Sequence, residues 1–154
     1  MENEKVKISH LKKAIWQSVR CYSKYNHLNP FKKEDGSIYM YERDEKQFEI
    51  SVIEMCGVPH LKFGAKLLEN IGFEDLPEYQ QLAAEYNGLL PQNATVYTDE
   101  QNFIFEWSPG FDGEPYYKYA VITMMYITTF CSILEEQKNM IQLFIQDLKN
   151  NRLN

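Results

Sequence analysis

Basic residues are missing from the middle of this chain. No lysine, arginine or histidine lies between Lys66 and Lys118, whereas residues 67–117 contain ten carboxylates. These are Glu69, Glu74, Asp75, Glu78, Glu85, Asp99, Glu100, Glu106, Asp112 and Glu114. A block of one charge sign repels phosphate, so we expect no nucleic-acid partner. The same block contains many apolar residues, among them Phe103 and Trp107, which predicts a folded segment with an acidic outer face.

Cysteines and long apolar runs are also scarce. Cys21, Cys56 and Cys131 form no Cys-x-x-Cys pair, and an odd number of cysteines is a poor disulfide framework. The first residues lack the apolar core of a signal peptide. The longest uncharged run, residues 119–134, is shorter than the ~20 residues that span a bilayer. We therefore expect a cytoplasmic protein with no membrane partner.

Catalytic motifs are absent too. The chain has no Gly-x-Gly-x-x-Gly, P-loop, Gly-x-Ser-x-Gly or His-Glu-x-x-His pattern. Its best enzymatic candidate is Cys56 with His60, which we place near a strand-to-helix turn where a helix N-terminus would lower the thiol pKa. No third residue at a recognisable spacing orients this pair, so we favour structural roles for both. The candidate metal ligands, each too isolated or too few, are His10, His27, Asp112 and Glu114. We predict a protein that is not an enzyme and has no cofactor and no metal.

The first third of the chain predicts a helix followed by a hairpin. Apolar residues recur at helical spacing after Ser9, a candidate N-cap, until Pro30 ends the helix. Residues 37–43 and 47–55 then alternate apolar and polar side chains on either side of a charged turn. This pattern predicts an antiparallel pair of strands.

The middle third predicts two helices. Pro59 suits the first turn of a helix, and an apolar period continues from it to Gly72. Asp75 and Glu78 have the spacing of a capping box, and the apolar stripe that follows closes at Asn87-Gly88. We expect Asp75 to cap this second helix.

The last third predicts a second hairpin and a terminal helix. Residues 94–97 and 103–107 are rich in β-formers and enclose an acidic turn, and residues 108–115 form a Gly/Pro loop. Residues 116–150 carry a heptad-like apolar stripe, as one long helix or two. The length of 154 residues fits one domain, residues 1–154. The predicted fold class is α+β: an antiparallel sheet of two hairpins packed against N-terminal, middle and long C-terminal helices.

From Leu82 onward the chain resembles a known family. A helix ending in Tyr86-Asn87 leads into a hairpin whose second strand reads Phe103-Ile104-Phe105-Glu106, and a terminal helix follows a Gly/Asp loop. This order, over residues 82–150, is similar to the YbjN family of bacterial sensory-transduction regulators, which share the type III secretion chaperone-like fold. The resemblance implies a small acidic α+β protein, often dimeric, that binds other polypeptides and has no known chemistry. It transfers no functional residue.

Aromatic residues are abundant, and they direct attention to binding surfaces. The chain has 11 Tyr, 9 Phe and 2 Trp, and Tyr and Trp favour interfaces because they join a large apolar body to a polar tip. The predicted partner-binding residues are Tyr39, Tyr41, Tyr97, Trp107, Tyr116 and Tyr117. An equally open alternative is that they cover the second face of a thin sheet.

The apolar stripe of the terminal helix is longer than a small domain readily covers. We therefore predict a homodimer, whose interface residues are Ile127, Leu134, Ile141, Ile145 and Leu148. The function that follows is a non-enzymatic, cytoplasmic, protein-binding module with a chaperone-like or regulatory role. The alternative is a small acidic inhibitor, such as an immunity protein, whose carboxylates block a basic partner enzyme.

Overall fold

The structure is a computed structural model that describes residues 2–153, with side chains from Leu11 to Arg152. A single six-stranded antiparallel sheet has the strand order β1-β2-β3-β4-β6-β5. Its strands are β1 (Asn29–Lys32), β2 (Ile38–Glu42), β3 (Glu45–Met55), β4 (Val58–Leu68), β5 (Ala94–Asp99) and β6 (Asn102–Trp107). The helices are α1 (Glu2–Asn26), α2 (Leu76–Tyr86) and α3 (Tyr119–Leu153), with short 3-10 turns η1 (Asn87–Leu89) and η2 (Tyr116–Lys118). The predicted α+β class is confirmed, with an antiparallel sheet and N-terminal, middle and long C-terminal helices.

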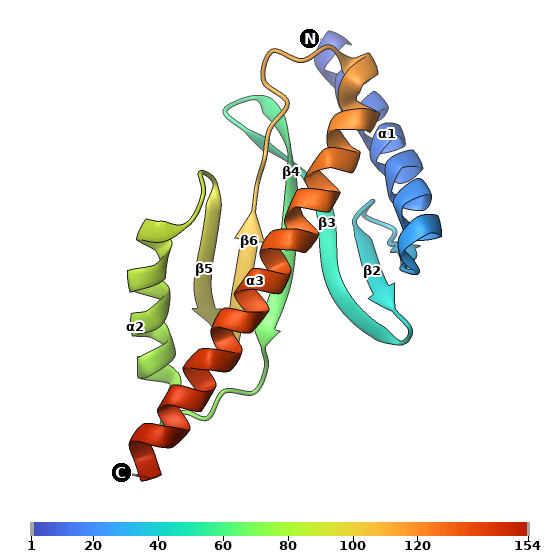
Figure 1. Cartoon of the computed structure of the whole chain (residues 1–154). Coiled ribbons are helices and arrows are strands. Elements are labelled where there is room, and N and C mark those ends of the chain that lie inside the picture. The colour runs from blue at the N-terminus through green and yellow to red at the C-terminus, as the bar shows by residue number, and fades with distance from the viewer. Residues whose placement is uncertain (1, 154) are drawn as a thin grey trace.

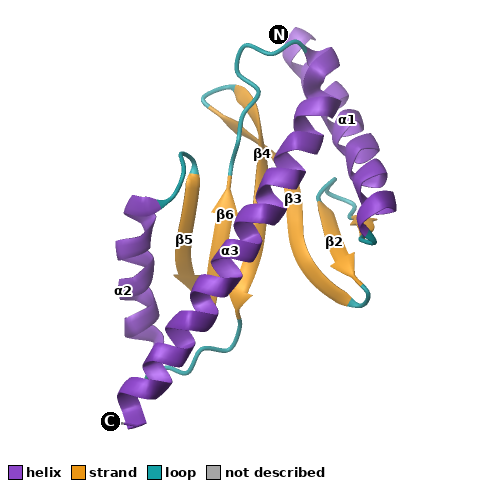
Figure 2. Cartoon of the chain, in the orientation of Figure 1, coloured by secondary structure: helices purple, strands orange, loops and turns teal. Residues whose placement is uncertain are grey.

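The helices cover one face of the sheet. Figure 1 shows α3 running diagonally across that face, with α1 beside its first half and α2 beside β5. A hydrogen bond of 2.8 Å from Ser18 Oγ to the Ala120 carbonyl joins α1 to α3. In the part of the chain that the structure describes, no helix covers the opposite face (Figure 2). We call that opposite surface the open face.

The core lies between α3 and the strands. Phe130 of α3 is fully buried, and its ring centroid lies 5.1 Å from that of Phe48, 4.8 Å from Phe63 and 5.6 Å from Phe105. These three rings come from β3, β4 and β6, so one helical residue joins three strands. Alternation along each strand explains the arrangement, because every second side chain points to the covered face.

Both edges of the sheet are protected from pairing with another strand. β1 is only four residues long and contains Pro30, which donates no ladder hydrogen bond. At the other edge, the Asn87 side chain accepts from the Val96 amide at 2.7 Å and donates to its carbonyl at 2.9 Å. The Asn87 amide group therefore occupies the hydrogen-bonding positions that a further strand would use beside β5.

Residues 59–72 are the largest correction to the sequence prediction. The predicted helix from Pro59 is the strand β4, paired with β3 and β6. The reason is the preceding turn, in which Cys56 and Gly57 both have positive φ, 53° and 77°. Two such residues form the tight hairpin turn that matches strand twist, and Met55 pairs directly with Val58 across it.

The remaining differences are smaller. The first helix begins at Glu2, so Ser9 lies within it and does not cap it. Residues 29–32, expected only as a break, form β1. The terminal helix is one helix, not two. Asp75 occupies the N-cap position of α2, but its side chain makes no capping hydrogen bond.

Candidate functional site

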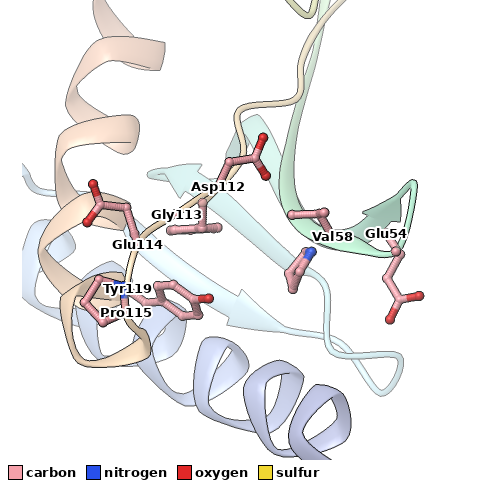
Figure 3. Close-up of a pocket in the computed structure, with 10 residues that line it drawn as sticks. Glu54, Val58, Asp112, Gly113, Glu114, Pro115 and Tyr119 are labelled. Carbon is pink, nitrogen blue, oxygen red and sulfur yellow. The ribbon is translucent and has the colours of Figure 1, made fainter. Parts of the chain in front are cut away.

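The main candidate site is a cavity of about 530 Å³ at the tip of the β3–β4 hairpin. Its walls come from the tip of that hairpin, the loop that precedes α3 and the first residue of α3 (Figure 3). The lining residues are Glu54, Gly57, Val58, Pro59, Phe111, Asp112, Gly113, Glu114, Pro115 and Tyr119. We call it the tip cavity.

Backbone pairing fixes the loop against the hairpin. The Leu61 amide donates to the Pro109 carbonyl at 3.0 Å, and His60 forms an isolated β-bridge with Gly110. After this bridge the loop turns, with the Glu114 amide donating to the Phe111 carbonyl at 3.1 Å. These bonds join residues about 50 positions apart and hold Asp112 and Glu114 next to the hairpin tip.

Aromatic rings form the floor of the tip cavity. Phe111 and Tyr119 are 3% and 4% exposed, and their ring centroids lie 4.6 Å apart. Tyr126 packs beside Phe111 at 5.6 Å, and its hydroxyl donates to the Gly110 carbonyl. These contacts hold the floor rigidly against α3.

The Tyr119 hydroxyl differs from that of Tyr126. It has no hydrogen-bond partner in the described part of the chain, and Figure 3 shows it pointing into the space between the loop and the hairpin. Burial raises the pKa of Tyr119 above its ordinary value, so the hydroxyl is neutral near pH 7. It can donate one hydrogen bond and accept others from a bound group.

Three carboxylates border the tip cavity. Figure 3 shows Glu54 on the hairpin side and Asp112 and Glu114 on the loop side, and all three side chains are exposed. Lys118 lies 3.9 Å from Glu114, but both ends of this pair are exposed, and such pairs contribute little. Burial raises the pKa of Tyr126, and the negative charges of Glu114 and Asp112 raise it further. The region is therefore electronegative.

The proposed thiol and imidazole pair has a different setting from the one expected. Cys56 is exposed at the hairpin turn and not at a helix N-terminus. His60 is 7% exposed, and its Nδ1 donates to the Val58 carbonyl at 3.0 Å. In residues 11–152, no group of three His, Cys, Asp or Glu side chains is placed to hold a metal ion.

The predicted partner-binding residues divide among three places. Tyr39 and Tyr41 lie together on the open face, with centroids 6.5 Å apart, and Tyr97 lies on the same face of β5, donating to Glu106 at 2.5 Å. Trp107 belongs to the core, where it stacks on Phe63 at 5.8 Å. Two further tyrosines, Tyr116 and Tyr117, are exposed at η2. The structure therefore does not gather these six residues into one surface.

The predicted interface residues are largely used within the chain. Ile127, Leu134 and Ile141 are buried in the core, and Ile145 and Leu148 pack partly against it. The sheet covers the apolar stripe that motivated a dimer. Self-association through these residues would have to disrupt the core. The reason for predicting this interface therefore no longer holds, and the oligomeric state stays a prediction.

The acidic block of residues 67–117 is dispersed rather than gathered. Asp75 and Glu78 both contact Arg152, Glu106 contacts Lys62 at 3.5 Å, and Glu114 has Lys118. Cations from outside the block thus offset four of its ten carboxylates.

Sequence reasoning missed most of the tip cavity. Glu54 could have been found from the sequence. It continues the series Phe48, Ile50 and Val52, whose side chains point to the covered face of the sheet, yet it bears a charge. No comparable signal marks Tyr119 or Phe111, whose positions depend on the docking of a loop.

Comparison with known proteins gives no relative, because no family model, curated protein or solved structure matches the chain. One helical stretch of the described residues, Tyr116–Arg152, is long and apolar enough to cross a membrane by length and composition. The core helix of a soluble protein passes the same test; in this stretch Ile127, Phe130 and Ile141 are buried, and 28% of the most apolar window is covered by the rest of the chain. Its composition alone therefore does not place the chain in a membrane.

Proposed function

We propose that the chain is a non-enzymatic, cytoplasmic protein that binds another polypeptide at the tip cavity. The observation that carries this proposal is the combination of an aromatic floor with exposed carboxylates around one open cavity. Its volume of about 530 Å³ lies within the ~300–1,000 Å³ typical of ligand sites. Apolar floors supply affinity in such sites, and charged groups select the partner.

Two features favour binding over catalysis. The groups that line the cavity are carboxylates and a neutral phenol, without a nucleophile and base held in contact. The backbone pairing between loop and β4 also fixes the cavity on rigid elements, which suits recognition of a partner. A chaperone-like or regulatory role of the kind implied by the YbjN resemblance is compatible with this surface.

The alternative of an acidic inhibitor has less support. An inhibitor that imitates a nucleic acid needs its negative charges on one continuous surface. The carboxylates of residues 67–117 instead lie in the connection between β4 and α2, on α2, on the β5–β6 hairpin and in the loop before α3, and four have cationic neighbours. A polypeptide binder with one acidic cavity fits these positions better.

The test is to isolate a partner and map its footprint. The full chain would be used as bait in extracts of its source cells, and the retained protein would then be purified and mixed with the chain. We expect hydrogen exchange to slow at residues 56–58 and 110–114 when the partner binds. Retention of no protein at micromolar bait concentration, or a footprint confined to α2 or the open face, would contradict the proposal.

The predicted homodimer needs its own measurement. Light scattering of the pure chain at tens of micromolar separates the 18.3 kDa monomer from a dimer. Partner binding at the tip cavity requires neither state.

A further inference from the structure

The walls of the tip cavity match an occupant that has an apolar stem and a positively charged end. Phe111, Val58 and Pro115 offer apolar surface, and the rings of Phe111 and Tyr119 offer π-faces that attract cations. Glu54 and Asp112 lie on opposite sides of the opening, and neither forms an ion pair with a lysine or arginine among the side chains of residues 11–152. An anionic occupant would be repelled by these charges, and an apolar one would gain nothing from them.

Tyr119 supplies a second, independent indication of a ligand. Its side chain is 96% buried, since only 4% of its surface is exposed, yet its hydroxyl has no partner in the described part of the chain. The atoms of residues 11–152 that are both fully buried and unpartnered are Ser23 Oγ, Thr123 Oγ1 and Gln137 Oε1, so the Tyr119 hydroxyl, which is not one of them, is open to the cavity into which it points (Figure 3). An N–H donor reaching the floor would satisfy it.

We propose, resting on the protein-binding function above, that the tip cavity receives a lysine or arginine side chain of the polypeptide partner. The alkyl stem lies along Phe111 and Pro115, and the Tyr119 hydroxyl accepts a hydrogen bond from the ammonium or guanidinium group. The carboxylates border the outer part of the cavity, whereas the hydroxyl lies at its floor. A lysine or arginine side chain that enters from a main chain on the surface lays its stem along the apolar wall and places its charge at the hydroxyl, where the carboxylates attract it through space. An amine without such a stem makes no contact with the apolar wall.

The direct test uses capped pentapeptides, Ac-Gly-Gly-X-Gly-Gly-amide, in which X is lysine, arginine or norleucine. Each is titrated into the ¹⁵N-labelled full chain to about 10 mM, because one side chain contributes only about millimolar affinity. We expect the lysine or arginine peptide to shift the amides of Gly57, Val58 and Asp112 to Glu114 in a saturable way. The norleucine peptide, which lacks the charge, and methylamine, which lacks the stem, should each bind roughly tenfold more weakly.

Variants locate the effect. The triple variant Glu54→Gln/Asp112→Asn/Glu114→Gln should weaken binding of the basic peptide roughly tenfold, because it removes all three carboxylates. Its matched control is Glu42→Gln/Asp44→Asn/Glu45→Gln, which makes the same charge change at the exposed β2–β3 turn and should leave binding unchanged. Tyr119→Phe keeps the ring but loses the acceptor, and should weaken binding about threefold. Unchanged spectra elsewhere confirm that each variant is folded.

Several results would overturn the inference. These are equal binding of the norleucine peptide, equal binding of methylamine, equal loss in the two triple variants, or no shift at all. A partner that binds the Glu54→Gln/Asp112→Asn/Glu114→Gln variant as tightly as the original chain would also overturn it, while leaving the protein-binding function in place. If no partner exists but the peptide titration succeeds, the proposed function fails and the cation site stands.

Discussion

The imidazole of His60 lies directly against the backbone of Gly110. A Cβ atom on Gly110 would be 2.5 Å from His60 Nε2 and 2.9 Å from its Cδ2. The ring has little freedom to move, because its Nδ1 donates to the Val58 carbonyl at 3.0 Å. This contact joins the loop before α3 to β4, next to Pro59 and Phe111 of the tip cavity.

Gly110→Ala should therefore destabilise the chain. We expect a loss of about 1–3 kcal/mol, the usual cost of overpacking a filled site. Gly88→Ala is the control, since a Cβ atom there meets nothing within 4 Å and should change stability by less than about 0.5 kcal/mol. Urea unfolding of both variants checks the prediction, and equal midpoints would contradict it.

Asp75 should act through Arg152 and not as a helix cap. Its carboxylate contacts the Arg152 guanidinium, and no capping hydrogen bond forms. The arginine side chain is 52% exposed, so we expect a coupling of only about 0.3–1 kcal/mol in a double-mutant cycle with Asp75→Ala and Arg152→Ala. Asp75→Ser separates the two roles, because serine can cap but carries no charge. It should behave like Asp75→Ala, and a wild-type midpoint for Asp75→Ser would restore the capping interpretation.

Stability should fall at alkaline pH because of the tyrosines. Burial raises the pKa of Tyr22, Tyr79, Tyr97, Tyr119 and Tyr126 above the ordinary value of 10.0, and the carboxylate of Glu106 raises that of Tyr97 further. The unfolded chain therefore loses these protons at a lower pH than the folded chain does. Each tyrosine thus stabilises the fold fully below about pH 9, and this contribution falls progressively as the pH rises through about 10. The slope contributed by one tyrosine is at most about 1.4 kcal/mol per pH unit.

Urea unfolding between pH 8 and about 11.5 measures this slope. Tyr97→Phe should make it shallower. Tyr25→Phe, at a side chain that is 74% exposed, should leave it unchanged. An equal effect of the two substitutions would show that the alkaline loss has another origin.

Iodoacetamide should distinguish the three cysteines. Cys21 and Cys56 are exposed, whereas Cys131 is partly covered and burial raises the pKa of its thiol, with hydrogen bonding to Tyr22 as an opposing influence. Because the thiolate is the reactive form, we expect Cys131 to react slowest. Cys56 should react at the rate of an ordinary free thiol, measured by mass spectrometry of labelled peptides. A far faster reaction of Cys56 at neutral pH would contradict its assignment as a turn residue without catalytic function.

The sequence alone determined those helices and strands whose residue pattern fits only one type of secondary structure. Residues 37–43 and 47–55 alternate in polarity, residues 94–97 and 103–107 are rich in β-formers, and all four are strands close to the bounds expected. The α2 stripe likewise repeats only with helical spacing. In each case local periodicity and turn chemistry agree, so burial of one face follows from the chain itself.

Tertiary structure decided β4 and the tip cavity. Leu61, Ala65 and Leu68 fit a helical repeat, while Leu61, Phe63 and Ala65 fit a strand, so the segment is ambiguous until β3 and β6 pair with it. The cavity needs residues from Glu54 to Tyr119, brought together by the Leu61–Pro109 hydrogen bond and the His60–Gly110 bridge. Such pairings between distant residues depend on how the loop docks on the finished sheet, which no local pattern in the chain encodes.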